Sequence, residues 1–315
     1  MSACSGGRCV ATVRAMSDKN DKKSNNPDPQ EAGAKPPFPK QEQSTPGTEG
    51  DLTPKADHGE GSYKGMGRLN GRAALVTGGD SGIGRAVALA FAREGADVAV
   101  SYLEEHEDAN ETKRLVEEAG RKCVLIPGDL VDEAQCKRVV AETAKAFGRL
   151  DIVVNNAGYQ GRELERFEDL DAQRLERTFR TNILAMFHIC RAALAHLKEG
   201  ATIINVASIQ AYQPKPAIID YASTKGAIVT FTKGLAQELI DRGIRVNCVA
   251  PGPVWTPLIP QSFGAEHVSK FGQNAPMGRP AQPAELAPAF VFLASDESRY
   301  INGEVLGVTG GKVLP

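Results

Sequence analysis

Tyr221 and Lys225 lie four residues apart in the stretch "YASTK", and the apolar residues of the following "GAIVTFTKGLAQELI" recur at helical spacing. On a helix these two side chains project from one face, one turn apart. A phenol with an ordinary pKa near ~10 is a poor base at neutral pH, and a neighbouring ammonium favours its phenolate. The pair could therefore transfer protons, with Tyr221 as general acid/base and Lys225 lowering its pKa. Two fixed positions make a weak motif, so other motifs in the chain are needed to distinguish this role from a chance placement of the two side chains on a helix surface.

A glycine-rich stretch, "TGGDSGIG", lies between the first short apolar run and the first helical segment. Gly78, Gly82 and Gly84 would let the backbone turn tightly and approach a pyrophosphate, which the N–H groups and dipole of a helix N-terminus stabilise. The spacing is G-x-x-x-G-x-G rather than G-x-G-x-x-G. Its position between a strand and a helix favours dinucleotide binding over an ordinary glycine-rich turn.

From Arg72 onward, short apolar runs alternate with longer amphipathic segments. The runs are "AALVTG", "DVAVSYL", "KCVLIPGD", "LDIVVNNAG", "TIINVAS", "RVNCVAPG" and "EVLGVTGG". Each is rich in β-branched residues and nearly continuous in apolar character, as a strand buried on both faces would be. Helical patterns occupy 83–94, 107–119, 132–147, 171–198, 221–241 and 283–294. The alternation predicts one doubly wound α/β (Rossmann) domain, with about seven parallel strands and helices on both faces of the sheet.

The chain divides into an N-terminal extension, residues 1–66, and a catalytic domain, residues 67–315. The extension is rich in Pro, Gly, Lys and Asp and shows neither strand nor helix periodicity, so we expect it to be largely irregular and dispensable for catalysis. Its "KPPFPK" and "SYKGMGRL" could instead lie extended on a neighbouring surface. Residues 253–278 have little regular period and are the expected substrate lid.

Five motifs in order resemble the classical short-chain dehydrogenases/reductases: the glycine-rich "TGGDSGIG", "NNAG" at 155–158, Ser208 after the fifth strand, Tyr221-x-x-x-Lys225, and "PG" at 251–252. The resemblance covers residues 68–315. Within that family, the Pro-rich extension, "GGDSGIG" and "APGPVWTPLIP" are similar to the glucose/ribitol dehydrogenase-like, or general-stress, oxidoreductases.

The resemblance implies a catalytic set of Asn182, Ser208, Tyr221 and Lys225, in which Asn182 positions a water, Ser208 binds the substrate oxygen and Lys225 also holds the nicotinamide ribose. It places the cofactor on Gly78, Ser81, Gly82, Ile83, Gly84, Tyr102, Asp129, Leu130, Asn156, Ala157, Gly158, Tyr221, Lys225, Pro251, Gly252, Val254 and Thr256. We expect the substrate at Ser208, Gln210, Tyr212 and Trp255, with Gln160 nearby.

Three of these assignments have structural alternatives. Asn182 could be a helix-interior polar residue bonded to backbone. Asp129 could cap the following helix. The Asn and Gly residues of "NNAG" are those that a tight turn requires, and we assign Asn155 and Gly158 a supporting role.

The choice of cofactor is expected to depend on the end of the second strand. An acidic residue there would bond the ribose 2′-OH and repel a 2′-phosphate, but this position holds Tyr102. Arg85 could reach a phosphate, and Glu104 and Glu105 would oppose it. The sequence therefore favours NADP, with NAD as the alternative.

The predicted function is hydride transfer between a nicotinamide and a carbonyl or alcohol, the substrate being a small aldehyde, ketone, sugar or polyol. One alternative is a catalytically weak nucleotide-binding or scaffold protein, although Ser208, Tyr221 and Lys225 are all present. A second is an epimerase or dehydratase of extended type, which usually carries a larger C-terminal domain.

Composition narrows the partners and the location. The net charge is -2, no long basic run occurs, and no apolar stretch approaches the ~20 residues of a membrane span, so we expect neither a nucleic-acid nor a membrane partner. No metal site is expected, and the resemblance implies a homotetramer. Four of the six cysteines lie inside apolar elements, which favours buried thiols and a cytoplasmic location. Residues 1–16 contain two arginines and no acid, so organelle targeting and a start at Met16 are the alternatives.

Overall fold

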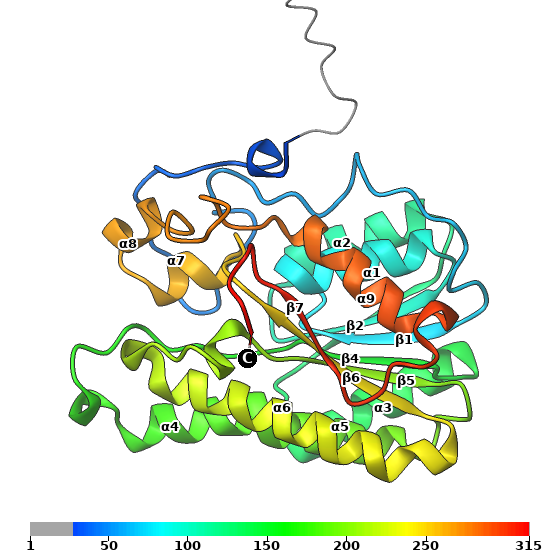
Figure 1. Cartoon of the computed structure of the whole chain (residues 1–315). Coiled ribbons are helices and arrows are strands. Elements are labelled where there is room, and N and C mark those ends of the chain that lie inside the picture. The colour runs from blue at the N-terminus through cyan, green and yellow to red at the C-terminus, as the bar shows by residue number, and fades with distance from the viewer. Residues whose placement is uncertain (1–27, 315) are drawn as a thin grey trace, which may run out of the picture.

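The computed structural model describes residues 28–314 and contains a seven-stranded sheet in which every pairing is parallel (Figure 1). The order is β3-β2-β1-β4-β5-β6-β7, so the direction of winding reverses between β1 and β4. The strands are β1 (Ala73–Thr77), β2 (Asp97–Tyr102), β3 (Cys123–Pro127), β4 (Ile152–Asn155), β5 (Thr202–Val206), β6 (Arg245–Pro251) and β7 (Val305–Val308). All seven predicted strands are present, and the predicted doubly wound fold is confirmed.

The helices also follow the predicted pattern, with one difference. They are α1 (Gly82–Arg93), α2 (His106–Glu118), α3 (Glu133–Phe147), α4 (Ala172–Phe179), α5 (Ala185–Ala193), α6 (Ile219–Leu239), α7 (Leu258–Ser262), α8 (Ala265–Ser269) and α9 (Pro283–Ala294). The segment predicted as one helix over 171–198 is α4 and α5 joined by a π-helical turn, Arg180–Leu184. The expected lid contains the short helices α7 and α8.

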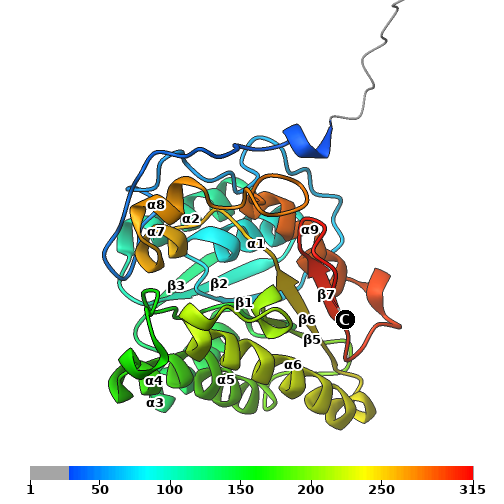
Figure 2. The same cartoon turned by 60° about the vertical axis from the view of Figure 1, so that its left-hand side comes forward.

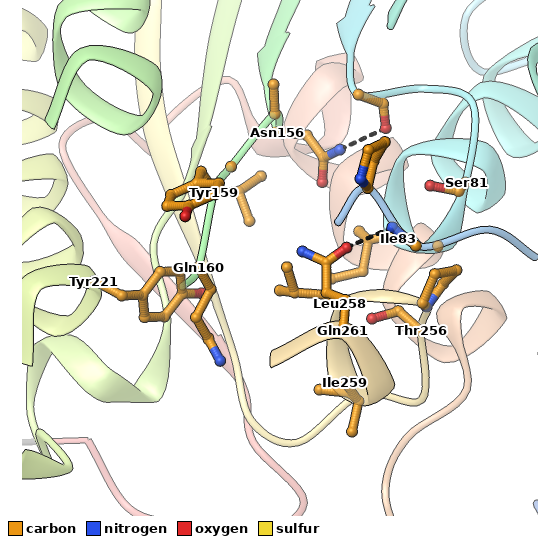
Figure 3. Close-up of a pocket in the computed structure, with 18 of the residues that line it drawn as sticks. Ser81, Ile83, Asn156, Tyr159, Gln160, Tyr221, Thr256, Leu258, Ile259 and Gln261 are labelled. Atoms are coloured by element: carbon orange, nitrogen blue, oxygen red, sulfur yellow. Dashed lines mark hydrogen bonds between the residues drawn. The ribbon is translucent and has the colours of Figure 1, made fainter. Parts of the chain in front are cut away.

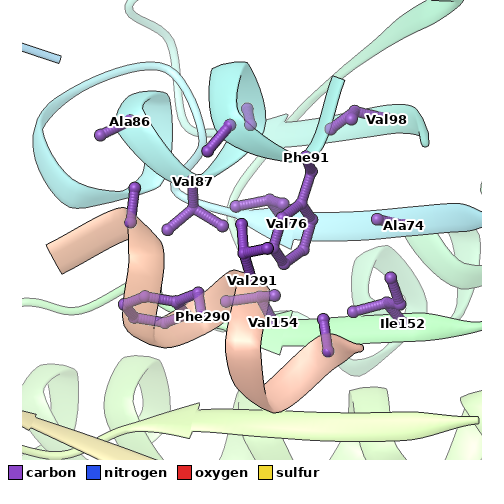
Figure 4. Packing of buried hydrophobic residues seen from close by; sticks show 14 of the residues in the cluster. Ala74, Val76, Ala86, Val87, Phe91, Val98, Ile152, Val154, Phe290 and Val291 are labelled. Atoms are coloured by element: carbon purple, nitrogen blue, oxygen red, sulfur yellow. The ribbon is translucent and has the colours of Figure 1, made fainter. Parts of the chain in front are cut away.

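Two layers of helices cover the sheet, with α1, α2 and α9 on one face and α3, α5 and α6 on the other (Figures 1 and 2). Successive strand residues point to opposite faces: Val76 packs in the first layer, whereas Leu75 packs in the second. Figure 4 shows Phe91 of α1 and Phe290 of α9 packed over β1 and β4. This double burial explains why the strands are nearly continuous in apolar character.

Residues 28–66 of the extension form no strand, and their one helical turn is Pro29–Glu31. They nevertheless lie against the domain, passing the lid helices before they reach α1 (Figures 1 and 2). Phe38 and Leu52 are buried in a third apolar cluster with residues of the lid. The predicted targeting segment, residues 1–16, lies outside the described residues.

Candidate active site

The glycine-rich stretch forms the turn between β1 and α1. Gly78 and Gly82 have φ values of +59° and +48°, a region that favours glycine. A Cβ added to Gly84 would lie 1.9 Å from the carbonyl oxygen of Gly78, so only glycine permits this approach. Asn156 fixes the turn, because its Nδ2 donates to the carbonyl oxygens of Thr77 and Gly78 at 2.9 Å. The turn therefore has the close backbone approach that a pyrophosphate site needs.

A cleft of about 640 Å³ extends from this turn past the reversal point of the sheet to the lid (Figure 3). Open α/β sheets bind ligands at this place, beyond the carboxyl ends of the strands. The predicted residues that line it are Gly78, Ser81, Gly82, Ile83, Tyr102, Asp129, Leu130, Asn156, Ala157, Gly158, Ser208, Gln210, Tyr221, Lys225, Pro251, Gly252, Val254 and Thr256. Gly84 does not line the cleft; its part is the close packing of the turn.

Three polar groups of the predicted catalytic set converge on the cleft. Tyr221 and Lys225 project from the first turns of α6, and both are buried. The Lys225 Nζ donates to the Val206 carbonyl at 2.8 Å and lies 5.2 Å from the centroid of the Tyr221 ring. Ser208 follows β5, and its Oγ accepts from the Gln210 N–H at 3.1 Å. The end of β5 and the start of α6 thus hold a hydroxyl, a phenol and an ammonium in one site.

Burial dominates the protonation of this site. It raises the pKa of the Tyr221 phenol to about 12, against a lowering by hydrogen bonding to Ser208. Burial also lowers the pKa of Lys225 to about 8. The predicted lowering of the Tyr221 pKa by Lys225 is wrong for the protein as it stands, because the ammonium is directed to a backbone carbonyl and is itself desolvated. The phenol is therefore protonated at neutral pH and suited to act as an acid toward a carbonyl oxygen.

Comparison with known proteins assigns the arrangement to a family. A family model described as "Enoyl-(Acyl carrier protein) reductase" matches residues 78–312. "Glucose and ribitol dehydrogenase" of Daucus carota is 50% identical over 282 residues, which cover 88% of this chain and 97% of that protein. This chain belongs to the classical short-chain dehydrogenases/reductases.

Two further relatives of this short-chain dehydrogenase/reductase carry a nicotinamide cofactor in their names. "NADPH-dependent aldehyde reductase 1, chloroplastic" of Arabidopsis thaliana is 48% identical over 276 residues, covering 85% of this chain and 96% of that protein. The crystal structure of a short-chain dehydrogenase from Burkholderia cenocepacia in complex with NADP has a TM-score of 0.73 and 36% identity, and covers 78% of this chain and 98% of that one. The protein is an NAD(P)-dependent oxidoreductase.

Asn182 has a structural task that the motif did not reveal. It lies in the π-helical turn and does not line the cleft. Its Oδ1 accepts from the Tyr159 N–H at 2.7 Å, and its Nδ2 donates to the Tyr159 carbonyl at 2.9 Å and to Thr224 Oγ1 at 3.1 Å. These bonds use both amide N–H groups and one lone pair of the oxygen, so Asn182 ties the chain after "NNAG" to α6. They correspond to the backbone-bonded alternative, although the Asn182 Oδ1 accepts only this one hydrogen bond and keeps a second acceptor position.

Two predicted substrate contacts are wrong. Trp255 is completely buried, its ring stacks on Phe38 at 4.1 Å, and its Nε1 donates to the Pro54 carbonyl at 2.8 Å. Tyr212 packs at the edge of the second core layer and does not line the cleft. The Trp255 assignment failed because a lid residue's direction depends on what packs behind the lid, whereas Tyr212 lies in the chain after β5 and packs against the second core layer.

The electrostatics at the end of β2 differ from the prediction. Arg85 is buried, and its guanidinium donates to the Asp80 and Asp108 carbonyls, to Thr112 and to the Asp108 carboxylate at 2.9 to 3.1 Å. It is therefore not free to meet a phosphate, and this part of the argument for NADP is wrong. The Tyr102 hydroxyl lies 2.9 Å from His106 Nδ1, at the wall of the cleft.

Asp129 lines the cleft at the end of β3. Its Oδ1 accepts from the Val131 N–H at 3.0 Å, and its other oxygen pairs with Arg177. The helix cap of α3 is Asp132, whose side chain accepts from the Ala134 N–H at 2.9 Å. The alternative of a helix cap at Asp129 is therefore wrong, and the carboxylate stands beside the cleft as a cofactor role requires.

Several residues of the cleft escaped the sequence analysis. Thr45, Pro46 and Gly47 of the extension line it, as does Gln261 of α7. No motif marks these extension residues, and their only signal was the suggestion that the Pro-rich segment lies on a surface. Within residues 28–314, no group of three or more His, Cys, Asp or Glu side chains could hold a metal ion, and no helix is long and apolar enough to cross a membrane.

Proposed function

We propose that this enzyme interconverts a small hydroxylated aldehyde or ketone, including the open form of a sugar, with the corresponding alcohol. The observation that carries the proposal is the convergence of Ser208, Tyr221 and Lys225 on a cleft that begins at a pyrophosphate-type turn. The names of the carrot and Arabidopsis relatives, a sugar and polyol dehydrogenase and an aldehyde reductase, support the same substrate class.

The residues of the chain divide the work of this reaction. A bound nicotinamide supplies or accepts the hydride at the carbonyl carbon. Ser208 donates a hydrogen bond to the substrate oxygen and stabilises its developing charge. Tyr221 gives its proton to that oxygen during reduction, for which its protonated state at neutral pH is suitable. Lys225 can replenish the proton, because burial brings its pKa to about 8.

Gln160 supports a hydroxylated substrate. Its side chain is 4% exposed, lines the cleft beside Tyr221 and has a Nε2 with no hydrogen-bond partner among the described residues (Figure 3). A buried amide donor without a partner costs about 1 to 3 kcal/mol, so such groups usually meet a ligand or water. A hydroxyl on the carbon next to the carbonyl would satisfy it.

A panel of aldehydes, ketones, sugars and polyols with both coenzymes tests the proposal through the absorbance of the reduced nicotinamide. The sharpest pair is glyceraldehyde and propanal, which differ in their hydroxyl groups. Gln160→Leu should raise KM for glyceraldehyde about tenfold and leave KM for propanal nearly unchanged, because it removes the donor and keeps the bulk. An equal change for both substrates would refute the role of Gln160, and no turnover of any carbonyl would refute the proposed function.

The preference for NADP stays part of the proposal, and it now rests on the absence of a carboxylate at Tyr102. Glu104 and Glu105 line the same cleft and would repel a 2′-phosphate, so the preference should be small.

A homotetramer is also proposed. Leu175 and Phe179 of α4, Leu184 of the π-helical turn and Phe187 of α5 are each 37 to 47% exposed along one continuous helical stretch. Large apolar side chains grouped in this way favour contact with a second copy. Light scattering on the wild type and on Phe187→Glu would test it, since the charge should dissociate the assembly.

A cytoplasmic location is supported by Cys123, Cys136, Cys190 and Cys248, which are all buried and free. Such thiols are typical of proteins from a reducing compartment. Fluorescent fusions of the full chain and of a chain that starts at Met16 would test this location against organelle targeting.

A further inference from the structure

Residues 36–58 of the extension, which we call the strap, join the lid to the coenzyme turn. On the lid side, the Phe38 N–H donates to the Ser269 carbonyl at 2.8 Å, and the Gln43 N–H donates to the Pro260 carbonyl at 2.9 Å. The Gly47 N–H donates to Gln261 Oε1 at 2.7 Å, and Figure 3 shows the dashed line that leaves the Gln261 oxygen. The strap is therefore attached to α7 and to the end of α8 by its backbone.

Apolar packing attaches the strap to the lid a second time. Phe38 stacks on Trp255, whose indole N–H is bonded to the Pro54 carbonyl, so two separate parts of the strap enclose this ring. Leu52 is completely buried in the same cluster, which also contains the catalytic Tyr221. The strap thus forms part of the packing around the reacting phenol.

At the coenzyme turn the strap provides a carboxylate. Glu49 is 5% exposed, and its Oε1 accepts from the Gly82 N–H at 2.8 Å, at the first residue of α1. Ser81 stands at the N-cap position but makes no capping hydrogen bond. Glu49 consequently does for α1 what an N-cap side chain does elsewhere, because it satisfies a terminal N–H and stabilises the positive end of the helix dipole.

Glu49 is itself held by two neighbours, Asp108 and His58. Its backbone N–H donates to Asp108 Oδ2 at 2.9 Å, and Asp108 is paired with Arg85. His58 Nε2 lies 2.9 Å from Glu49 Oε1, while His58 Nδ1 lies 3.1 Å from Glu60. This cluster fixes the carboxylate relative to both α1 and α2, so the position of the turn depends on the strap.

We propose that Glu49 is a positioning residue for the coenzyme, and that the strap couples the coenzyme turn to the substrate lid. Glu49 fixes Gly82 so that the turn is preformed for the pyrophosphate, and Gly47, through Gln261, holds the lid over the same cleft. The extension is then required for tight coenzyme binding, contrary to the expectation that it is dispensable. The proposal rests on NAD(P) binding alone and is independent of the substrate.

The direction in which coenzyme affinity changes when Glu49 is removed distinguishes repulsion of the pyrophosphate from positioning of the turn. A carboxylate near a pyrophosphate repels it, so removal of Glu49 would tighten binding if repulsion dominated. Both ring nitrogens of His58 face carboxylate oxygens, of Glu49 and Glu60, so both can donate only as the imidazolium, whose charge offsets that of Glu49. Burial opposes this charge, but the two hydrogen bonds raise the pKa of His58. Positioning should therefore outweigh repulsion, and loss of Glu49 should weaken binding.

Isothermal titration calorimetry of the full chain with NADPH and with NADH, in the absence of substrate, measures this directly. Glu49→Ala should raise the coenzyme Kd about tenfold, as expected for loss of a cap at about 1.4 kcal/mol. Glu49→Gln should stay within about threefold of the wild type, because its amide oxygen still accepts from the Gly82 N–H. Asp51→Asn, an exposed carboxylate on the same segment, is the matched control and should bind as the wild type does.

A folded Glu49→Ala with a Kd within about twofold of the wild type, or with tighter binding, would overturn the proposal. Phe38→Ala tests the coupling from the lid side even if Glu49→Ala fails to fold. Since Phe38 lies on the lid and not at the turn, its removal should raise the coenzyme Kd at least about threefold only if the strap connects the two. A folded Phe38→Ala with unchanged coenzyme Kd would refute the coupling.

Discussion

Tyr221→Phe should abolish most turnover while leaving the coenzyme site intact. The substitution removes one oxygen and keeps the ring, which packs among Phe38, Leu52 and Ile218 in the third apolar cluster. Proton transfer by a positioned side chain typically increases the rate by a factor of about 10² to 10⁴, or about 3 to 5 kcal/mol of activation free energy. We therefore expect kcat to fall at least about a hundredfold.

Stability and coenzyme binding should change little in the same variant. The lost hydroxyl interaction with Ser208 is worth about 1 kcal/mol, which corresponds to a shift in Tm of about 2 to 4 °C. In the proposed role the phenol oxygen moves a proton and does not hold the dinucleotide, so the coenzyme Kd should stay within about twofold.

Steady-state rates with saturating coenzyme, calorimetric Kd values and thermal melts separate these effects. A variant that keeps more than about a tenth of the wild-type kcat would refute the assignment of Tyr221 as acid/base. A variant that loses activity together with coenzyme binding or several more degrees of Tm would show that the phenol is structural instead.

Three other predictions test the neighbouring groups. Lys225→Ala should lower both kcat and coenzyme affinity, because we propose that this one buried ammonium serves both the phenol and the nicotinamide ribose. A change in affinity alone would exclude its proton role. The wild type should favour NADP over NAD by less than about tenfold in kcat/KM, and Tyr102→Asp should shift this ratio toward NAD by at least about tenfold. A wild type that prefers NAD by more than about tenfold would refute the proposed preference for NADP. Hydrogen bonding to His58 lowers the pKa of Glu60 to about 2 against the effect of burial, so the stability that Glu60 contributes is present above about pH 4.5 and is lost as the pH falls toward 2. The pKa of His58 is raised, so the stability that His58 contributes is present below about pH 6.5 and is lost as the pH rises through its folded-state pKa. The difference in Tm between wild type and His58→Gln should thus be largest between about pH 4.5 and 6.5, and a difference that grows in alkali would contradict this cluster.

The sequence by itself determined the strands, most of the helices and the place of the candidate catalytic residues in the fold. Strand and helix periodicity is local, so each of the seven apolar runs could be read without its partners. The candidate reacting groups at Ser208, Tyr221 and Lys225 follow a strand end or begin a helix, and a parallel sheet brings such ends to one edge. The same reasoning placed Gly78, Gly82 and Gly84 in the first turn.

Only the tertiary structure decided where side chains with several candidate partners point. Arg85 was expected near a phosphate, but the Asp108 carboxylate on α2 holds it away. Trp255 turned from the cleft because Phe38, more than two hundred residues earlier in the chain, offers it an aromatic face. Glu49 lies in a segment without periodicity, and its contact with Gly82 joins parts of the chain that no local pattern relates. Such contacts depend on packing between distant segments, so composition and spacing do not encode them in a readable form.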